Sequence, residues 1–180
     1  VRRCGRFQGP RGASSRDPHG CRIASWFWDN AQMFHVVLYE PEIPPNTGNV
    51  IRLCANAGAA LHLIEPLGFP IDHAKMRRAG LDYREFMDLR VHSSLQAFLD
   101  AVRPARLFAF SSKARVRFDR VAYAPGDALM FGSETRGLPE AALAAVPEDR
   151  RLYLPMRPDN RSLNLSNAVE VPGHNQVVAG

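Results

Sequence analysis

The sequence predicts an α/β fold in which a parallel β-sheet is flanked by helices. From Met33 onward, short apolar segments alternate with segments of helical pattern, an order that is typical of parallel sheets with helices on both faces. The apolar segments lack a strict alternation of apolar and polar residues, as expected for strands that are buried on both sides. The chain has 180 residues, which suits one domain with a sizeable core, and we find no internal repeat or linker.

Five strands are expected, and each is a short apolar run. They are "FHVVLYE" (34–40), "ALHLIEP" (60–66), "RLFAFSS" (106–112), "ALMFGSE" (128–134) and "RLYLPM" (151–156). Helices are expected between them, where apolar residues recur with a helical period. These helices cover 49–58, 94–102, 138–146 and a last helix that begins within 162–171. The segment 73–86 is expected to be helical at first and interrupted at Gly80.

The N-terminal segment 1–32 differs in composition from the rest of the chain. It is rich in Arg, Gly, Pro and Ser and shows no sustained hydrophobic period, which predicts disorder. Met33 stands directly before the first expected strand. The segment is therefore either a mis-called extension upstream of a true start at Met33 or a basic RNA-binding arm.

The charge of the chain permits a polyanionic partner without requiring one. The net charge is +5 and the sequence pI is about 9.6, and arginine supplies nearly all the positive charge, since Lys75 and Lys113 are the only lysines. No apolar run approaches the roughly 20 residues of a membrane span, and the first residues lack a secretory signal, so we expect a cytoplasmic protein. The cysteines show no metal-ligand or disulfide spacing.

The helix expected at 49–58 carries an unusual polar face. Its apolar stripe consists of Val50, Leu53, Cys54 and Ala57, and its polar stripe consists of Asn49, Arg52 and Asn56. Asn46 or Thr47 is expected to cap the helix, and Gly58 is expected to end it. Surface helices usually carry Glu and Lys, whereas Asn is a poor helix former. The polar stripe is therefore either a solvated face or a face selected for hydrogen bonding.

Two later loops also follow strand ends, where ligands collect in open parallel sheets. In "FGSETRGLP" (131–139), Gly132 ends a strand and Gly137 precedes the next helix, so a ligand could approach the backbone there. The segment has neither the ending of a P-loop nor the glycine spacing of the dinucleotide fingerprint. Glu134 and Arg136 could form an ordinary ion pair within this loop.

The second of these loops, "PMRPDNRSLNLSNA" (155–168), holds more short polar residues than helix capping needs. They are Ser162, Asn164, Ser166 and Asn167. No Ser-His-Asp pattern, zinc-ligand spacing or carboxylate pair is present in the sequence. Several histidines are scattered along the chain, and we expect them to be structural or exposed. They are His35, His62, His73 and His92.

Taken together, five segments resemble the SPOUT class of S-adenosylmethionine (AdoMet)-dependent RNA methyltransferases, within the SpoU/TrmH superfamily. They are "LYEPEIPPNTGNVIRLCANAG", "LHLIEPLGF", "RRAGLDY", "LMFGSETRGLP" and "PDNRSLNLSNAV". The segments occur in the family's order and cover nearly everything from Phe34 to Val171. Within the class, the chain is most similar to the tRNA 2'-O-methyltransferases that modify the wobble cytidine or uridine of leucine tRNAs.

The resemblance implies one methyltransferase domain over 33–171, with a C-terminal trefoil knot and a homodimeric assembly. It implies S-adenosylmethionine as the methyl donor, tRNA as the partner, and no metal. By family position, the residues expected at the donor site are Phe110, Gly132, Leu154 and Ser162. The residues expected to contact RNA are Asn46, Asn49, Arg52 and Arg136.

The resemblance also implies in-line transfer of a methyl group from a sulfonium to a ribose 2'-oxygen, in which positioning supplies much of the rate. Arg52 stands where related RNA methyltransferases carry an arginine assigned to activating the 2'-hydroxyl. A guanidinium stays protonated in proteins, so we favour Arg52 as a donor to the adjacent phosphate and the developing alkoxide, with direct base catalysis as the alternative. Asn164 and Glu134 are expected to orient the site.

The chain departs from the family after Val171. The family's last helix continues as an apolar segment, whereas Pro172 and Gly173 are expected to break it here, and the tail 172–180 does not resemble the family. A truncated last helix would leave the knot poorly anchored and the dimer surface incomplete. Two alternatives therefore stand beside wobble methylation: an inactive remnant that retains only RNA binding, and an enzyme that methylates a different RNA nucleotide.

Overall fold

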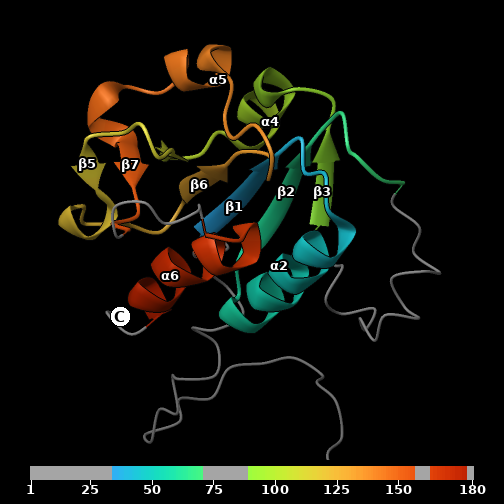
Figure 1. Ribbon diagram of the computed structural model, residues 1–180, viewed down its shortest axis with the longest axis horizontal. Helices are drawn as coiled ribbons and strands as arrows, with labels where there is room; N and C mark the ends of the chain where they lie inside the picture. Colours follow the sequence, from blue (N-terminus) through green and yellow to red (C-terminus); the bar gives the residue numbers. More distant parts are fainter. Residues whose placement is uncertain (1–33, 71–88, 157–162, 178–180) are drawn as a thin grey trace, which may run out of the picture. The chain divides into compact units, whose positions relative to one another are not determined.

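The computed structural model describes residues 34–70, 89–156 and 163–177 (Figure 1). The expected N-terminal extension, the segment 73–86 and Ser162 lie outside these residues. The trefoil knot stays a prediction, because residues 157–162, which join the last strand to the last helix, also lie outside the described part.

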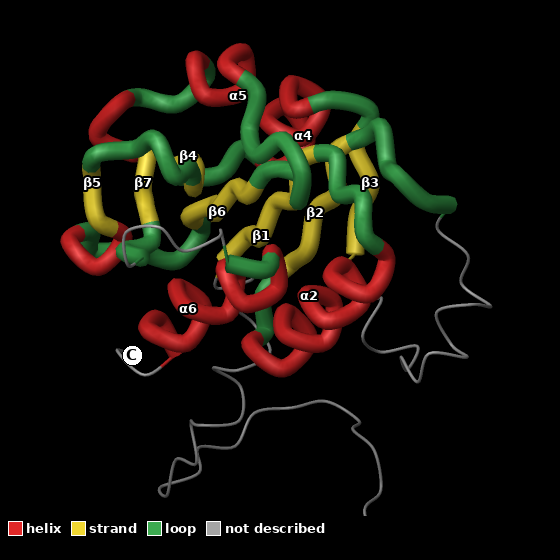
Figure 2. The backbone as a smooth tube through the Cα atoms, in the orientation of Figure 1, coloured by secondary structure: helices red, strands yellow, loops and turns green. Residues whose placement is uncertain are grey.

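In the described part of the chain, seven parallel strands form one sheet (Figure 2). In chain order they are β1 (Phe34–Tyr39), β2 (Ala60–Ile64), β3 (Leu89–His92), β4 (Arg106–Phe110), β5 (Val116–Arg117), β6 (Asp127–Phe131) and β7 (Arg151–Tyr153). In space the order is β3-β2-β1-β6-β4-β7-β5, and all neighbouring pairs are parallel. The predicted parallel sheet is confirmed.

Helices cover both faces of this sheet (Figures 1 and 2). One face carries α2 (Pro44–Ala57) and α6 (Leu165–Val177), which pack against each other, and the other carries α4 (Leu95–Val102) and α5 (Glu140–Ala144). Two short 3-10 turns complete the described elements: η2 (Phe118–Arg120) and η3 (Glu148–Arg150). The three-layer arrangement follows from the alternation of strands and helices in the sequence.

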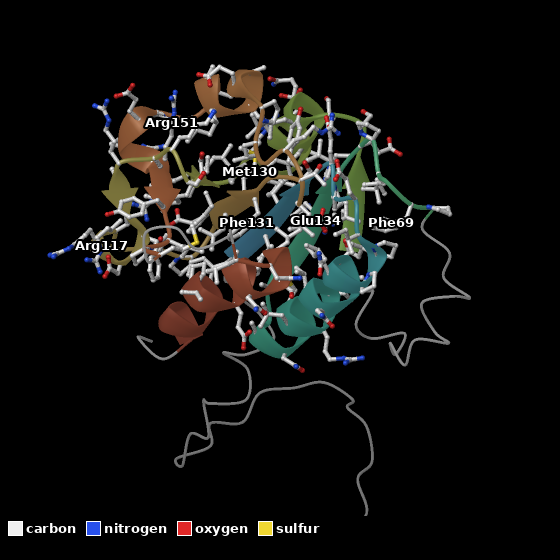
Figure 3. All side chains as sticks on the ribbon, in the orientation of Figure 1. Phe69, Arg117, Met130, Phe131, Glu134 and Arg151 are labelled. Atoms are coloured by element: carbon white, nitrogen blue, oxygen red, sulfur yellow. The ribbon has the colours of Figure 1, made fainter. Side chains whose placement is uncertain are left out.

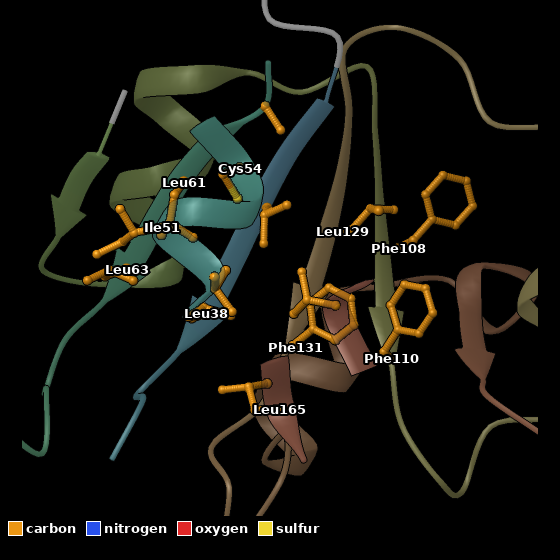
Figure 4. Close-up of a cluster of buried hydrophobic side chains, with 14 of the residues drawn as sticks. Leu38, Ile51, Cys54, Leu61, Leu63, Phe108, Phe110, Leu129, Phe131 and Leu165 are labelled. Atoms are coloured by element: carbon orange, nitrogen blue, oxygen red, sulfur yellow. The ribbon is translucent and has the colours of Figure 1, made fainter. Parts of the chain in front are cut away.

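Successive side chains of each strand point to opposite faces, so the sheet has two apolar cores. The core beneath α2 and α6, drawn in Figure 4, includes Leu38, Ile51, Cys54, Leu63, Phe108, Phe131, Leu165 and Val169. The core beneath α4 and α5 includes Val37, Phe98, Met130 and Leu143. Burial on both faces explains why the central strands read as continuous apolar runs.

The start of α2 differs from the prediction. The helix begins at Pro44, because its two prolines occupy the first turn, where a missing N–H removes no helical hydrogen bond. Ile43 is the N-cap residue and makes no side-chain cap bond, so the cap predicted at Asn46 or Thr47 is wrong. Both of these side chains lie inside the helix and are buried.

The sequence pattern does not predict β3 and β5. β3 has four residues, reads LRVH with two exposed side chains, and lies at one edge of the sheet. β5 has two residues and lies at the other edge. Strands this short lack the apolar run on which strand prediction depends. The five expected strands also end earlier than predicted, where the chain turns into the loops at their carboxyl ends.

The last helix does not end at Pro172. α6 continues to Val177 with the proline inside it, so the prediction that Pro172 and Gly173 break the helix is wrong. Leu165, Val169 and Pro172 are buried at helical spacing, and α6 packs against α2. Burial of this stripe offsets the hydrogen bond that the proline removes.

Three histidines form a hydrogen-bonded row across β1, β2 and β3. The Nδ1 of His35 lies 3.1 Å from the Nε2 of His62, and the Nδ1 of His62 lies 3.0 Å from the Nε2 of His92. His62 is 0% exposed, and Phe98 of α4 packs edge-on against the rings of His62 and His92. Of the two predicted alternatives, structural or exposed, these three histidines are structural. They are not scattered in space, because neighbouring parallel strands bring them together.

The two hydrogen bonds of this row also require the same ring nitrogen of each histidine to carry the proton. A neutral imidazole has one N–H and one acceptor nitrogen. If His62 donates from Nε2 to His35, then His92 must donate from Nε2 to His62; the reverse direction places every proton on Nδ1. The three rings therefore share one tautomer. Burial is the main cause that lowers the pKa of all three, and at His62, where His35, His92 and Arg90 add to the effect, the pKa falls to about 3.

We expect acid to destabilise the protein through this row. The pKa of His62 lies below its ordinary value of 6.5 in the folded state, so below pH 6.5 the unfolded chain binds a proton that the folded chain does not. The stability that the neutral His62 contributes is complete above that pH and is lost as the pH falls. The slope of the free energy of unfolding against pH approaches about 1.4 kcal/mol per pH unit for one proton.

Urea unfolding from about pH 7.5 to about pH 5 measures this slope for the wild type and for His62→Leu. The slope of the free energy of unfolding against pH should be smaller in the variant by the equivalent of about one proton, whatever its stability at neutral pH. Equal slopes for the two proteins would contradict the assignment.

Candidate active site

The polar residues of the candidate site gather where two neighbouring strands end. β1 lies beside β6, but the chain leaves β1 towards β2 on one side and leaves β6 towards β7 on the other. Such a switch point opens a crevice outside the carboxyl ends of an open parallel sheet. The loop 40–43 after β1 and the loop 132–139 after β6 therefore meet here; Figure 3 labels Phe131, which ends β6, and Glu134 in the loop that follows.

The carboxylate of Glu134 joins these two loops. Its Oε2 accepts a hydrogen bond from the backbone N–H of Glu42 at 2.8 Å. Its Oε1 accepts from the N–H of Ile43 at 3.3 Å and from the side-chain amide of Asn46 at 3.0 Å. A negative charge at a helix N-terminus is favoured by the helix dipole, and hydrogen bonds to a carboxylate are stronger than neutral ones. A distant residue thus supplies the side-chain contact at the start of α2 that was predicted for Asn46 or Thr47.

Asn46 extends this contact to the last helix. Asn46 is 6% exposed, and its Oδ1 accepts a hydrogen bond from the Nδ2 of Asn164 at 3.0 Å. The Oδ1 of Asn164 accepts from the backbone N–H and the hydroxyl of Ser166, as an N-cap residue does at a helix start. We call these contacts the Glu134–Asn46–Asn164 network. It joins the loop after β6, the first turn of α2 and the start of α6.

Arg52 lies on the exposed face of α2. Asn49 and Asn56 are exposed on the same face, whereas Val50 and Cys54 on the opposite face are buried. The amphipathic pattern predicted for this helix is therefore confirmed. Because the network holds the first turn of α2, it also holds the helix from which the Arg52 side chain extends.

The loop after β6 closes tightly on itself. A Cβ added at Gly132 would lie 2.1 Å from the carbonyl carbon of Gly137 and 2.2 Å from the backbone nitrogen of Leu138, so no side chain fits there. The N–H of Gly137 donates to the carbonyl of Ser133 at 2.9 Å, and the φ of Gly137 is +69°. The two glycines singled out in the sequence are therefore required by the shape of this loop.

Three of the four residues expected at the donor site lie at the ends of neighbouring strands. Phe110 ends β4, Gly132 follows β6, and Leu154 follows β7; these strands lie in the order β6-β4-β7. The ring of Phe110 stacks on that of Phe131 with 4.5 Å between centroids and belongs to the core. A ligand at this position would therefore meet the backbone rather than the ring. The fourth residue, Ser162, is outside the described residues.

Arg136 pairs with the loop after β1. Its Nη2 donates to the Oε1 of Glu42 at 3.2 Å and lies 3.8 Å from the Oε2 of Glu40. The hydroxyl of Thr135 donates to the other oxygen of Glu42 at 2.6 Å. These contacts with Thr135 and Arg136 lower the pKa of Glu42, so its carboxylate is charged at neutral pH. The ion pair considered between Arg136 and Glu134 does not form, because Glu134 bonds to the start of α2.

Sequence reasoning missed Glu42 and Thr135. Neither residue belongs to a recognisable spacing, and a carboxylate or hydroxyl in a loop carries no signal of its own. The one available indication is that Glu42 lies between Pro41 and Pro44, in a stiffened loop directly after a strand.

Two negative findings apply to the described part of the chain. Within it, no group of three or more His, Cys, Asp or Glu side chains is placed to hold a metal ion. No helix among the same residues has the length and apolar character needed to cross a membrane.

Comparisons with known proteins agree with this architecture. A tRNA (cytidine(34)-2'-O)-methyltransferase of Burkholderia ambifaria is 63% identical over 141 residues, which cover 77% of this chain and 90% of that protein. A solved structure named "Structural insights into the 2-OH methylation of C/U34 on tRNA" has a TM-score of 0.73 and 48% identity, and covers 83% of this chain and 99% of its own. An AdoMet-bound rRNA methyltransferase from Sinorhizobium meliloti has the same fold, with a TM-score of 0.67, 22% identity, and coverage of 80% of this chain and 55% of its own.

A family model matches the same part of the chain as these relatives. The family described as the SpoU rRNA Methylase family matches residues 33–173, a range that contains all the strands of the sheet and the whole Glu134–Asn46–Asn164 network. The chain therefore belongs to the SpoU rRNA methylase family.

Proposed function

We propose that the protein is an S-adenosylmethionine-dependent tRNA methyltransferase that acts on the ribose 2'-hydroxyl of the wobble nucleotide, cytidine or modified uridine, in leucine tRNAs. The observation that carries the proposal is the network at the switch point, which joins the helix of Arg52 to the loop of Gly132. The Burkholderia relative is named for 2'-O-methylation of cytidine 34. The leucine isoacceptors rest on the family resemblance of the five sequence segments.

The ends of β4, β6 and β7 suit S-adenosylmethionine. Gly132 presents backbone without a side chain, and two partly buried leucines follow strands of the same sheet edge: Leu138 after β6 and Leu154 after β7. Apolar contacts with a few backbone donors and acceptors are what an adenosine site requires. We assign Phe110 and Ser162 to the same site, and the solved relative from Sinorhizobium supports a donor bound by this fold. When bound, the donor supplies a methyl group activated by a sulfonium.

Arg52 holds the RNA in this proposal. A guanidinium can donate to two phosphate oxygens at once, and it stays protonated in proteins. We therefore assign Arg52 to the phosphate beside the target ribose and to the alkoxide that develops on the 2'-oxygen. As the O–CH₃ bond forms and the S–CH₃ bond breaks, the hydroxyl proton leaves to phosphate or water. Asn49 lies on the same exposed face of α2 and offers an amide to the RNA.

Glu134 and Asn164 act as positioning residues. In-line transfer depends on the distance and angle between donor and acceptor, so that a misplacement of about 1 Å can reduce the rate by about a hundredfold. Glu134 belongs to the loop that carries Gly132, and Asn46 belongs to the helix that carries Arg52. The hydrogen bond between them sets the place of the RNA-binding helix relative to the donor site.

We further propose that the enzyme is a cytoplasmic homodimer. Leu163 and Val171 expose large apolar side chains next to and along α6, which suits contact with a second copy. The continuation of α6 to Val177 and its packing against α2 favour a folded enzyme over an inactive remnant.

Replacing Gly132 with Ala should block the donor site. The added Cβ would collide with the backbone of Gly137 and Leu138, so the loop must open. We expect the affinity for S-adenosylmethionine, measured by calorimetry, to fall at least about tenfold. Gly126→Ala is the matched control, because it strains a glycine of positive φ before β6 with only Ala105 within contact distance. Unchanged donor affinity in Gly132→Ala would contradict this donor site.

Replacing Arg52 with Ala should abolish methyl transfer and largely spare donor binding. The purified protein would be incubated with leucine tRNAs and S-adenosylmethionine, and methylated nucleotides would be mapped by mass spectrometry. The wild type and Arg120→Ala, an exposed arginine of η2, should methylate the wobble ribose. Methylation elsewhere in the tRNA would refute the assigned nucleotide, and full activity of Arg52→Ala would remove Arg52 from the mechanism.

A further inference from the structure

Glu42 connects the two loops of the candidate site by two separate sets of contacts. Its backbone N–H donates to Glu134 at 2.8 Å, and a Cβ at Gly68 would lie 2.7 Å from the Cα of Glu42, so the loop after β2 packs closely on this backbone. Its side chain accepts from Thr135 at 2.6 Å and from Arg136 at 3.2 Å. Since the backbone is held independently, the carboxylate can leave its two partners without moving the loop.

The partners of this carboxylate form a small anion-binding group. Thr135 and Arg136 are consecutive residues, and together they present a hydroxyl and a guanidinium to the same carboxylate. A second carboxylate, that of Glu40, lies 3.8 Å from the same guanidinium nitrogen. A hydroxyl beside an arginine fits a phosphate as well as it fits a carboxylate, because both anions offer pairs of oxygens in similar geometry.

The contact with Arg136 is weak enough to be exchanged. The Arg136 side chain is 73% exposed and that of Glu42 is 25% exposed. Ion pairs open to solvent contribute little to stability, so a phosphate that reaches Arg136 has only a small interaction to replace. The exposed guanidinium also lies at the carboxyl edge of the sheet, in the loop that carries Gly132 and Glu134.

We propose that Thr135 and Arg136 form a phosphate subsite for the RNA, and that Glu42, assisted by Glu40, occupies it as a stand-in anion until RNA binds. The inference rests on the proposed function and specifies its RNA contact. On binding, the phosphate takes the place of the Glu42 carboxylate on the guanidinium, and Glu42 turns to solvent while its backbone remains on Glu134. The exchange replaces hydrogen bonds and makes or breaks no covalent bond.

The exchange has a consequence for selectivity. An anion must displace the Glu42 carboxylate to bind Arg136, so a free phosphate ion binds this subsite with little net free energy. A phosphate of an RNA that is already held elsewhere, for example at Arg52, is supplied at high effective concentration and displaces the carboxylate. The Glu42 side chain therefore favours RNA that engages the site at several points.

A double-mutant cycle with Glu42→Gln and Arg136→Gln tests the exchange. Glutamine keeps the shape of Glu42 and an oxygen that can accept from Thr135. It removes the negative charge that pairs with the Arg136 guanidinium. We expect Glu42→Gln to bind leucine tRNA about two- to fivefold more tightly than the wild type, and Arg136→Gln to bind it more weakly. In the Arg136→Gln background, Glu42→Gln should leave tRNA affinity unchanged, because there is no guanidinium to release.

Further measurements separate the exchange from general charge repulsion. Glu65→Gln, which removes an exposed carboxylate after β2, should change the affinity for tRNA by the same small amount in the wild type and in Arg136→Gln. Arg136→Gln should also reduce the dependence of log affinity on log salt by about one unit, as the loss of one phosphate contact does. The exchange alone would be overturned if Glu42→Gln raised tRNA affinity equally with Arg136 and with Gln at that position. It would also be overturned if Glu42→Gln did not raise tRNA affinity while Arg136 is present. A wild-type protein that binds S-adenosylmethionine but no tRNA would overturn the proposed function as well.

Discussion

The carboxylate of Glu134 accepts hydrogen bonds from Glu42, Ile43 and Asn46, and the arrangement of the candidate site depends on these contacts. Without them, the start of α2 would lose the carboxylate that lies at the positive end of its dipole. The buried amide of Asn46 would also lose one of its two side-chain partners. Because α2 carries Arg52 and the Glu134 loop carries Gly132, this one carboxylate relates the proposed RNA contact to the proposed donor site.

The sheet topology explains why three segments distant in the sequence can share such a contact. β1 and β6 are neighbours at the switch point, so the loops after them face the same crevice, and α6 packs beside α2 on the covering layer. The opposite ends of the strands are built differently: Arg106 at the start of β4 makes a bidentate pair with the buried Asp127 at the start of β6. In that pair Asp127 is fully buried, whereas the Arg136 and Glu42 side chains of the pair at the carboxyl edge are 73% and 25% exposed.

Much of this architecture follows from the sequence, and the exceptions have physical causes. The parallel sheet and the faces of α2 were predictable because apolar runs and helical spacing are local patterns. The cap of α2 was not, since Glu134 is 88 positions from Asn46 and only tertiary structure brings them together. The histidine row was missed for the same reason. The helix break predicted at Pro172 was wrong, because burial of α6 outweighs the tendency of proline to end a helix. The roles of Glu42 and Thr135 depend on pairing that no single-sequence pattern encodes.

Glu134 and Asn164 do not bond to each other, and in this structure Asn46 couples them into one unit. Urea unfolding of Glu134→Ala, Asn164→Ala and the double variant, each with and without Asn46→Ala, measures this directly. We expect the effects on the free energy of unfolding to be non-additive by about 1 kcal/mol while Asn46 is present and additive once it is replaced. Additive effects in the presence of Asn46 would show that Glu134 and Asn164 are not coupled.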